Sequence, residues 1–181
     1  MDSRRMKRFS FILGLGALLA FVATPSYSVQ SVGSSEIQVS GGFFHAQDSN
    51  TSDLSADVSY GYYFFQPLEV GIRQGINYTF INNADNPWLA TTTPFIDYYF
   101  FADRNFQPFV GGFGGIVWND DDITGTIGPE GGIKYYVNDT TFLEARYRYE
   151  WFFNDFDVIE DEASDGNQVV TVGIGFVWGG R

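Results

Sequence analysis

The chain has 181 residues, of which 22 are acidic, 10 are basic, 19% are aromatic and none is cysteine. This length fits one domain, and the absence of cysteine excludes disulfide frameworks, thiol chemistry and cysteine-based metal sites. The acidic balance argues against a nucleic-acid partner, because binding to phosphates needs clustered lysine and arginine side chains.

Residues 1–28 have the order of a secretory signal peptide. Basic residues at positions 4, 5, 7 and 8 precede an apolar run at positions 9–22, and Ser26 and Ser28 mark a cleavage site. Fourteen apolar residues are short for the alternative of a retained membrane helix. A twin-arginine signal is a second alternative, but Lys7 stands where that signal has an apolar residue. Cleavage would leave a mature domain, residues 29–181, with a formal charge of −15, from six basic and 21 acidic residues.

The mature domain alternates apolar and polar residues with the period of two that is typical of strands. The stretch 141–151 is the clearest example, because Leu143, Tyr147 and Trp151 alternate with charged residues. The glycine-rich stretch 106–118 has no assignable faces. In chain order, the predicted strands are 36–44, 53–64, 68–80, 88–100, 106–118, 126–137, 141–151 and 168–178. Each has about the ten residues that a tilted strand needs to cross a bilayer.

The connections between these strands alternate in length. Short turns are expected at 65–67, 102–105 and 138–140, and longer polar loops at 45–53, 81–87, 119–123 and 152–167. This alternation predicts an antiparallel meander with tight turns at one end and acidic loops at the other.

The apolar face carries most of the aromatic side chains, and this decides which face lies inside. The interior of an eight-stranded barrel is only just wide enough for side chains, so such rings would overfill it. The rings also crowd the strand ends, as they do at membrane interfaces. The sequence therefore predicts an all-β fold, an eight-stranded antiparallel up-and-down transmembrane β-barrel. A soluble lipocalin-like barrel is the alternative, and it would hide its rings in mid-strand. Tyr63, Phe95, Tyr99 and Phe142 are exceptions that point inward.

The polar face would then line the lumen and carry charges of both signs. Isolated charges there would cost several kcal/mol, so they should pair across strands and plug the barrel. An open ion pathway is the alternative, but eight strands leave little bore. The predicted network comprises Glu69, Arg73, Glu130, Lys134, Glu144, Arg146, Arg148 and Glu150, and the same face carries Glu36, Asp57 and Asp97.

Two acidic loop clusters are weak candidates for Ca²⁺ binding, because carboxylates suit this ion. Their spacing is not that of an EF-hand, and charge clusters in loops are usually solvated. The candidate ligands are Asp120, Asp121, Asp122, Asp155 and Asp157. We expect no other metal site and no cofactor.

The chain resembles the small eight-stranded outer-membrane barrels of the OmpA/OmpX type. The resemblance rests on the signal peptide, the eight strands, FQPFVGGFGG (106–115), GPEGGIKYYVND (128–139) and the final aromatic-rich strand. It implies a Gram-negative outer membrane, contact with its lipids and lipopolysaccharide, and insertion by the outer-membrane assembly machinery. We also expect a monomer whose loops meet an extracellular ligand of unknown identity.

The chain departs from this resemblance in two ways. Such barrels usually end on an aromatic residue, which resembles a recognition signal for assembly, whereas here Trp178 is followed by Gly179, Gly180 and Arg181. In addition, no peptidoglycan-binding domain follows the barrel, so a wall-anchoring role is not implied.

We expect a structural or surface-interaction role without enzymatic activity. A narrow channel is one alternative. Another is a lipid A-modifying enzyme, because some similar barrels combine histidine with serine or aspartate near the membrane surface. His45 is the only histidine, with Asp48, Ser49 and Ser55 nearby. Gln47 stands where the deacylase-type sequence has serine, so the sequence does not favour this alternative.

Overall fold

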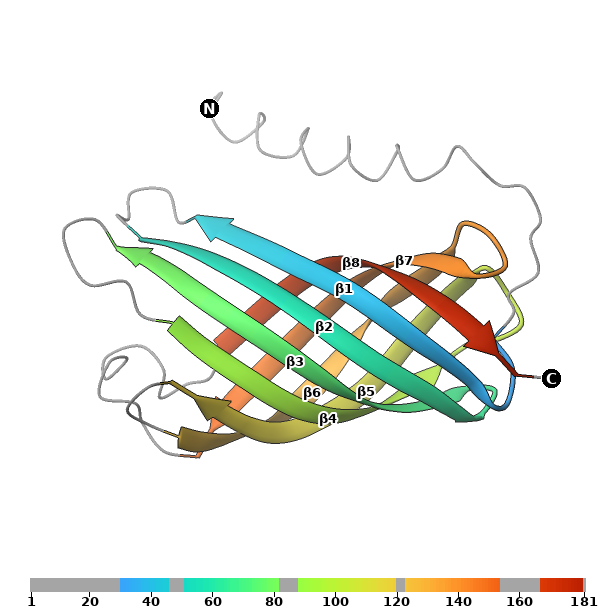
Figure 1. The fold of residues 1–181 in the computed structure, drawn as a ribbon, viewed down its shortest axis with the longest axis horizontal. Coiled ribbons are helices and arrows are strands. Elements are labelled where there is room, and N and C mark those ends of the chain that lie inside the picture. Colours follow the sequence, from blue (N-terminus) through green and yellow to red (C-terminus); the bar gives the residue numbers. More distant parts are fainter. Residues whose placement is uncertain (1–29, 46–50, 82–87, 120–122, 154–166, 181) are drawn as a thin grey trace, which may run out of the picture.

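Eight antiparallel strands form a closed barrel in the computed structural model, which describes residues 30–45, 51–81, 88–119, 123–153 and 167–180 (Figure 1). The strands are β1 (Ser34–His45), β2 (Thr51–Phe65), β3 (Leu68–Ile81), β4 (Trp88–Tyr99), β5 (Phe106–Trp118), β6 (Ile123–Tyr136), β7 (Thr141–Phe152) and β8 (Asn167–Gly179). Each strand pairs with the next, and β1 pairs with β8 from Ser34↔Gly179 to Gly41↔Val172. The predicted fold is therefore confirmed. The predicted signal peptide lies outside the described residues.

The predicted strand bounds agree with the structure to within a few residues. The largest difference is in β6, which begins at Ile123, whereas the sequence predicts a start at residue 126. Ile123 pairs with Trp118 of β5, so the β5–β6 hairpin extends to Ile123. The glycine and threonine residues at the start of β6 hid this extension from the sequence pattern. The described residues contain no helix long and apolar enough to cross a membrane.

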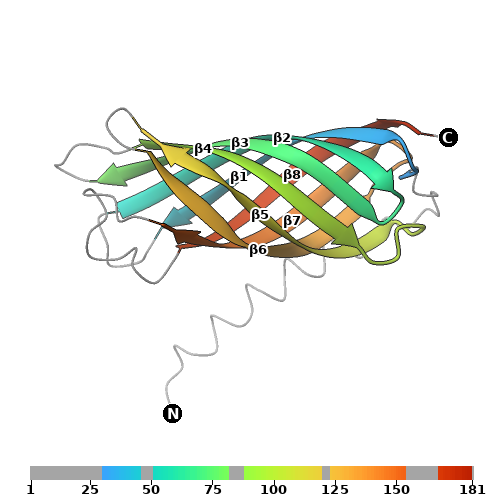
Figure 2. The same cartoon turned by 90° about the horizontal axis from the view of Figure 1, so that it is seen from below.

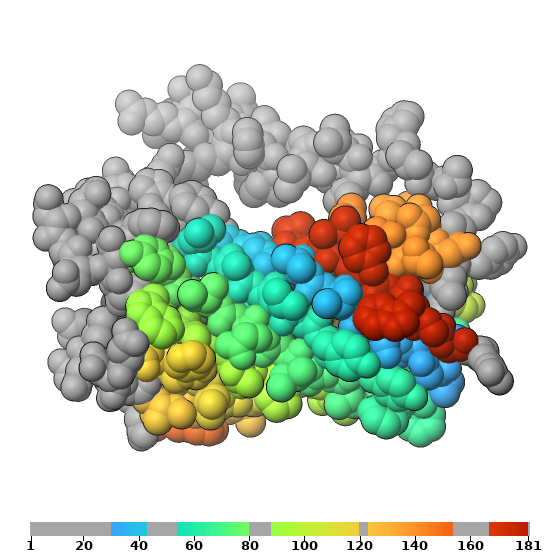
Figure 3. Space-filling view, viewed as in Figure 1, coloured from blue at the N-terminus to red at the C-terminus, as the bar shows by residue number. Residues whose placement is uncertain are grey.

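The strands alternate between an exposed wall and a buried lumen. In β7, Leu143, Tyr147 and Trp151 are exposed by 37–47%, whereas the charged residues between them are buried. The same alternation runs around the barrel and gives an outer surface of aliphatic and aromatic side chains, which Figure 3 shows packed into a wall on one side. Every charged side chain that the structure describes within the strands is buried in the lumen.

Glycine-rich β5 has the same alternation, although its sequence did not reveal it. Phe109, Phe113 and Val117 are buried in the lumen, whereas Val110 and Ile116 are exposed. Gly111 also faces inward, and a side chain there would meet Asp97 of β4. Small residues on β5 therefore leave room for the side chains of the neighbouring strand.

Two prolines interrupt the hydrogen-bonded ladders locally. The β4–β5 register omits Thr93 and Pro94, and the β6–β7 register omits Gly128 and Pro129. Proline has no N–H to donate to a ladder. The register is the same on either side of each interruption, so the barrel remains closed.

The short turns and the C-terminus lie at one end of the barrel, and the strands tilt relative to its long axis (Figures 1 and 2). In the β6–β7 turn, Asn138 Oδ1 accepts hydrogen bonds from the backbone N–H groups of Thr140 and Thr141, both at 2.9 Å. At the barrel seam, the Ser34 hydroxyl donates to the Gly179 carbonyl at 3.4 Å. These contacts lie at the end of the barrel where β1 begins and β8 finishes.

Candidate functional site

The lumen near the short turns is organised around the ammonium group of Lys134 on β6. Lys134 Nζ lies 2.8 Å from both carboxylate oxygens of Glu36, 3.5 Å from Glu69 Oε2 and 3.9 Å from Glu144 Oε2. These three acids come from β1, β3 and β7. Lys134 is fully buried, so one cation neutralises charge contributed by strands from around the barrel.

Aromatic side chains enclose this cluster. Lys134 Nζ lies 4.4 Å from the ring centroid of Tyr99 and 4.3 Å from that of Phe142, distances at which a cation is attracted to a ring face. The Tyr63 hydroxyl donates to Glu36 Oε2 at 2.6 Å, and the Tyr99 hydroxyl donates to Glu69 Oε2 at 2.7 Å. The aromatic rings therefore shield the ion pairs from water, and the two tyrosine hydroxyls donate hydrogen bonds to the carboxylates.

A second cluster lies around Arg146 and shares Glu144 with the first. Arg146 Nε lies 2.8 Å from Glu144 Oε1, and Arg146 Nη1 lies 2.9 Å from Asp97 Oδ2 and 2.8 Å from Glu130 Oε2. Glu130 in turn pairs with Arg73 Nη1 at 3.0 Å. Shared carboxylates thus join Lys134, Arg146 and Arg73 into one network that spans β1, β3, β4, β6 and β7.

A third group is smaller and more loosely paired. Arg148 Nη2 lies 3.4 Å from Asp57 Oδ2, and Arg148 Nε lies 3.8 Å from Glu150 Oε1. Both acids are buried. The buried charges in the described part of the chain comprise four cations and seven carboxylates, so the lumen has an excess of acid.

The structure places every residue of the predicted lumen network inside the barrel and brings each within 4.0 Å of a partner of opposite charge. Glu36, Asp57 and Asp97, which the sequence placed on the same face, are partners in these pairs. The result is a packed charged core inside the barrel.

The sequence placed four aromatic residues on the inner face, and the structure buries all of them: Tyr63, Phe95, Tyr99 and Phe142. Sequence reasoning missed two further rings of this core. Phe109 lies on the strand whose faces were not assignable, and its ring centroid is 4.6 Å from the Arg146 guanidinium carbon. Tyr136 is also buried against Phe142. Phe109 lies two residues after Gln107 in β5, and Tyr136 lies two residues after Lys134 in β6, so each shares a face with an inward polar residue. This spacing is the sequence signal that identifies the two rings as inward.

The remaining predicted site residues fall in parts of the chain about which the structure says nothing. Asp120, Asp121, Asp122, Asp155 and Asp157, the candidate Ca²⁺ ligands, lie outside the described residues. The His45 side chain does so as well, although its backbone ends β1. Among the described residues, no group of three or more acidic or histidine side chains is arranged to hold a metal ion.

Comparison with solved structures shows where this fold has been seen. The N-terminal β-barrel domain of Pseudomonas aeruginosa OprF matches with a TM-score of 0.51 at 17% identity, over 82% of this chain and all of that domain. Neisserial surface protein A (NspA) matches with a TM-score of 0.58 at 13% identity, over 79% of this chain and 95% of that protein. No protein-family model and no curated sequence matches the chain. The chain therefore has the fold of the small eight-stranded outer-membrane barrels, as its sequence led us to expect.

Proposed function

We propose that this protein is an integral outer-membrane barrel with a plugged lumen, and that it acts through the surface it presents rather than by catalysis or transport. The observation that carries the proposal is the polarity of the wall: the exposed face is aliphatic and aromatic, and the described charged side chains of the strands are inside. Such a surface is stable against lipid and unstable in water. The structural neighbours, which are barrels of the same kind, support the location.

The two ends of the barrel would face opposite sides of the membrane. In barrels of this class the short turns face the periplasm and the longer connections face the outside. The longer connections of this chain contain clusters of aspartate and glutamate, which would form the surface for an extracellular ligand. The wall would contact membrane lipids and lipopolysaccharide, and the assembly machinery would act during insertion.

Cell fractionation and gel mobility test the location. We expect the mature chain in the outer-membrane fraction, with a gel mobility that changes on boiling because a closed barrel resists detergent until it is heated. A monodisperse mature chain in detergent-free buffer would contradict the proposal.

Single-channel recording tests the plug. The pairs around Lys134 and Arg146 fill the lumen with side chains that are nearly inaccessible to solvent, so we expect no conductance from the purified barrel in planar bilayers. Steady openings would instead favour the narrow channel.

Mass spectrometry of lipid A from cells with and without the protein tests the enzyme alternative. We expect no change in lipid A acylation.

A further inference from the structure

We propose that two copies of this barrel associate in the membrane through the lipid-facing surface around Gln74, in place of the monomer expected from the sequence. The inference rests on the proposed membrane location. It starts from a polar side chain that the alternation of the strands does not explain.

Gln74 lies in the middle of β3, on the face that points away from the lumen, and is exposed. Its outward neighbours on the same strand, Ile72 and Ile76, are aliphatic and about half exposed. Gln168, the other outward glutamine within the described strands, lies at the loop end of β8. Gln74 is thus an amide placed where the hydrocarbon core of the bilayer would be.

The protein satisfies only part of this amide. The Thr92 hydroxyl of β4 donates to Gln74 Oε1 at 2.7 Å. Within the described ranges, the Gln74 amide nitrogen donates to no other group. Hydrocarbon offers no hydrogen-bond partner, so each unsatisfied polar group there is costly.

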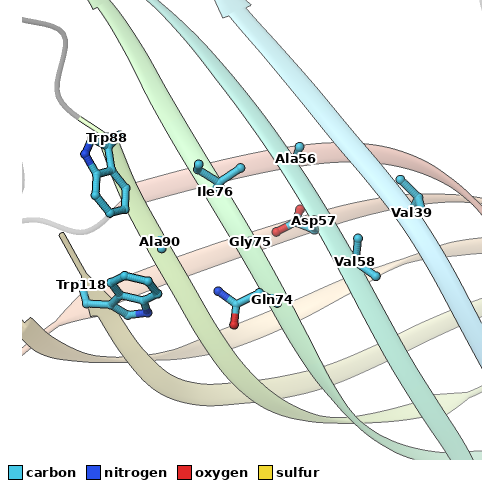
Figure 4. A pocket seen from close by; sticks show the side chains of 10 residues that line it. All are labelled: Val39, Ala56, Asp57, Val58, Gln74, Gly75, Ile76, Trp88, Ala90 and Trp118. Carbon is cyan, nitrogen blue, oxygen red and sulfur yellow. The ribbon is translucent and has the colours of Figure 1, made fainter. Parts of the chain in front are cut away.

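A shallow apolar groove of about 350 Å³ adjoins Gln74 on the same outer wall (Figure 4). Ala56 and Ala90 are small, whereas Val58, Ile76 and the rings of Trp88 and Trp118 are larger and stand around them. Small side chains at membrane interfaces allow a neighbouring backbone to approach closely. The groove therefore provides a place for side chains of a neighbouring wall beside the polar group.

A second copy of the chain fits this surface better than a lipid does. An acyl chain fills an apolar groove but offers no hydrogen bond at this depth. An amide contains both a donor and an acceptor, so two Gln74 side chains can pair reciprocally. Identical surfaces meet about a twofold axis. Because all copies insert in the same direction, that axis runs along the membrane normal, close to Gln74.

The absence of cysteine makes a direct crosslinking test possible. Ile76→Cys places a thiol on the proposed interface, and Ala145→Cys places one on exposed β7, which lies opposite β3 in the strand order of the barrel. After mild oxidation in lipid vesicles, we expect disulfide-linked dimers from Ile76→Cys and few from Ala145→Cys. Equal crosslinking of the two variants would overturn the proposal, because it would indicate random collision.

A second pair of variants tests the role of the amide. In the Ile76→Cys background, Gln74→Leu keeps the size of the side chain and removes its hydrogen bonds, and we expect the dimer association constant to fall about tenfold. Gln168→Leu makes the same chemical change at the loop end of β8 and should leave association unchanged. An undiminished dimer in Gln74→Leu would overturn the proposal. So would a wild-type barrel that stays monomeric at every protein-to-lipid ratio with a lipid held in the groove, or an Ile76→Cys barrel that crosslinks in cell membranes to a different protein.

Gel mobility before and after boiling distinguishes failure of this inference from failure of the proposed function. An Ile76→Cys barrel that shifts on boiling but stays monomeric contradicts only the dimer. A wild-type chain that shows no such shift and remains outside the membrane contradicts the membrane location itself.

Discussion

Lys134 shows how a single residue can hold distant strands together. Its side chain is the only cation within 4.0 Å of Glu36 and Glu69 among the described residues, and it also reaches Glu144. Buried ion pairs gain little net stability over a well-packed apolar core, because both charges lose their water. The loss of one partner is different, since it leaves the other charges buried and uncompensated.

We therefore expect Lys134→Met to lower the free energy of unfolding by about 3–5 kcal/mol, measured by urea unfolding in lipid vesicles. Arg104→Met is the matched control, because Arg104 is exposed on the β4–β5 turn, and its loss should change stability by about 1 kcal/mol or less. Adding Glu36→Gln to Lys134→Met should recover part of the loss by removing one of the unpaired charges. Equal effects of Lys134→Met and Arg104→Met would show that the network does not stabilise the barrel.

At the scale of the strand, glycine has two different roles that sequence does not separate. Gly132 of β6 faces the lumen, where a side chain would meet the Ala145 carbonyl oxygen and the Phe109 ring. Gly112 of β5 faces outward, and the nearest atom to a side chain there would be the Gly128 carbonyl oxygen at an ordinary 3.5 Å. The inward glycine thus permits close packing, whereas the outward one has room for a methyl group.

This contrast predicts opposite results for the same substitution. Gly132→Ala should destabilise the barrel by about 1–3 kcal/mol, because the backbone oxygen of β7 cannot move away without disturbing the ladder. Gly112→Ala should be neutral or slightly stabilising, because alanine loses less conformational freedom on folding than glycine does. Both free energies of unfolding can be measured in the same vesicles. A Gly112→Ala loss as large as that of Gly132→Ala would contradict the assignment of the two faces.

At the scale of the whole molecule, all four tryptophans lie on the outer wall. Trp118, Trp151 and Trp178 are 36–48% exposed, and Trp88 packs against Trp118 with ring centroids 5.9 Å apart. Trp88, Trp118 and Trp151 lie toward the long connections, whereas Trp178 lies toward the short turns. This arrangement is typical of the two aromatic belts of a membrane barrel.

We expect brominated acyl chains to quench most of the tryptophan fluorescence of the folded barrel in vesicles, and aqueous iodide to quench little of it. The reason is that, in the proposed location, lipid would surround the indole rings in place of water or the lumen. Urea-unfolded protein is the control and should show the reverse. Strong quenching by iodide together with insensitivity to brominated lipid would contradict a membrane-embedded wall.

The sequence alone determined the number of strands, their approximate bounds and, for every strand except β5, the direction in which each face points. Alternation with a period of two identifies strands because successive side chains point to opposite sides. The narrow interior of an eight-stranded barrel then assigns the aromatic face to the outside. The same reasoning places Glu144, Arg146 and Arg148 in the lumen.

Only the tertiary structure decided which charges meet. Lys134 is paired with Glu36, which lies almost one hundred residues earlier in the chain. The register of β6 with β7 and the closure of β1 on β8 bring these two side chains together in space. The faces of β5 also required its neighbours, because its glycines carry no side chains to reveal a pattern. The groove beside Gln74 depends on side chains from five strands, β1 to β5. Alternation is a local property of one strand, whereas pairing across the lumen and the shape of the outer wall arise only when the barrel closes.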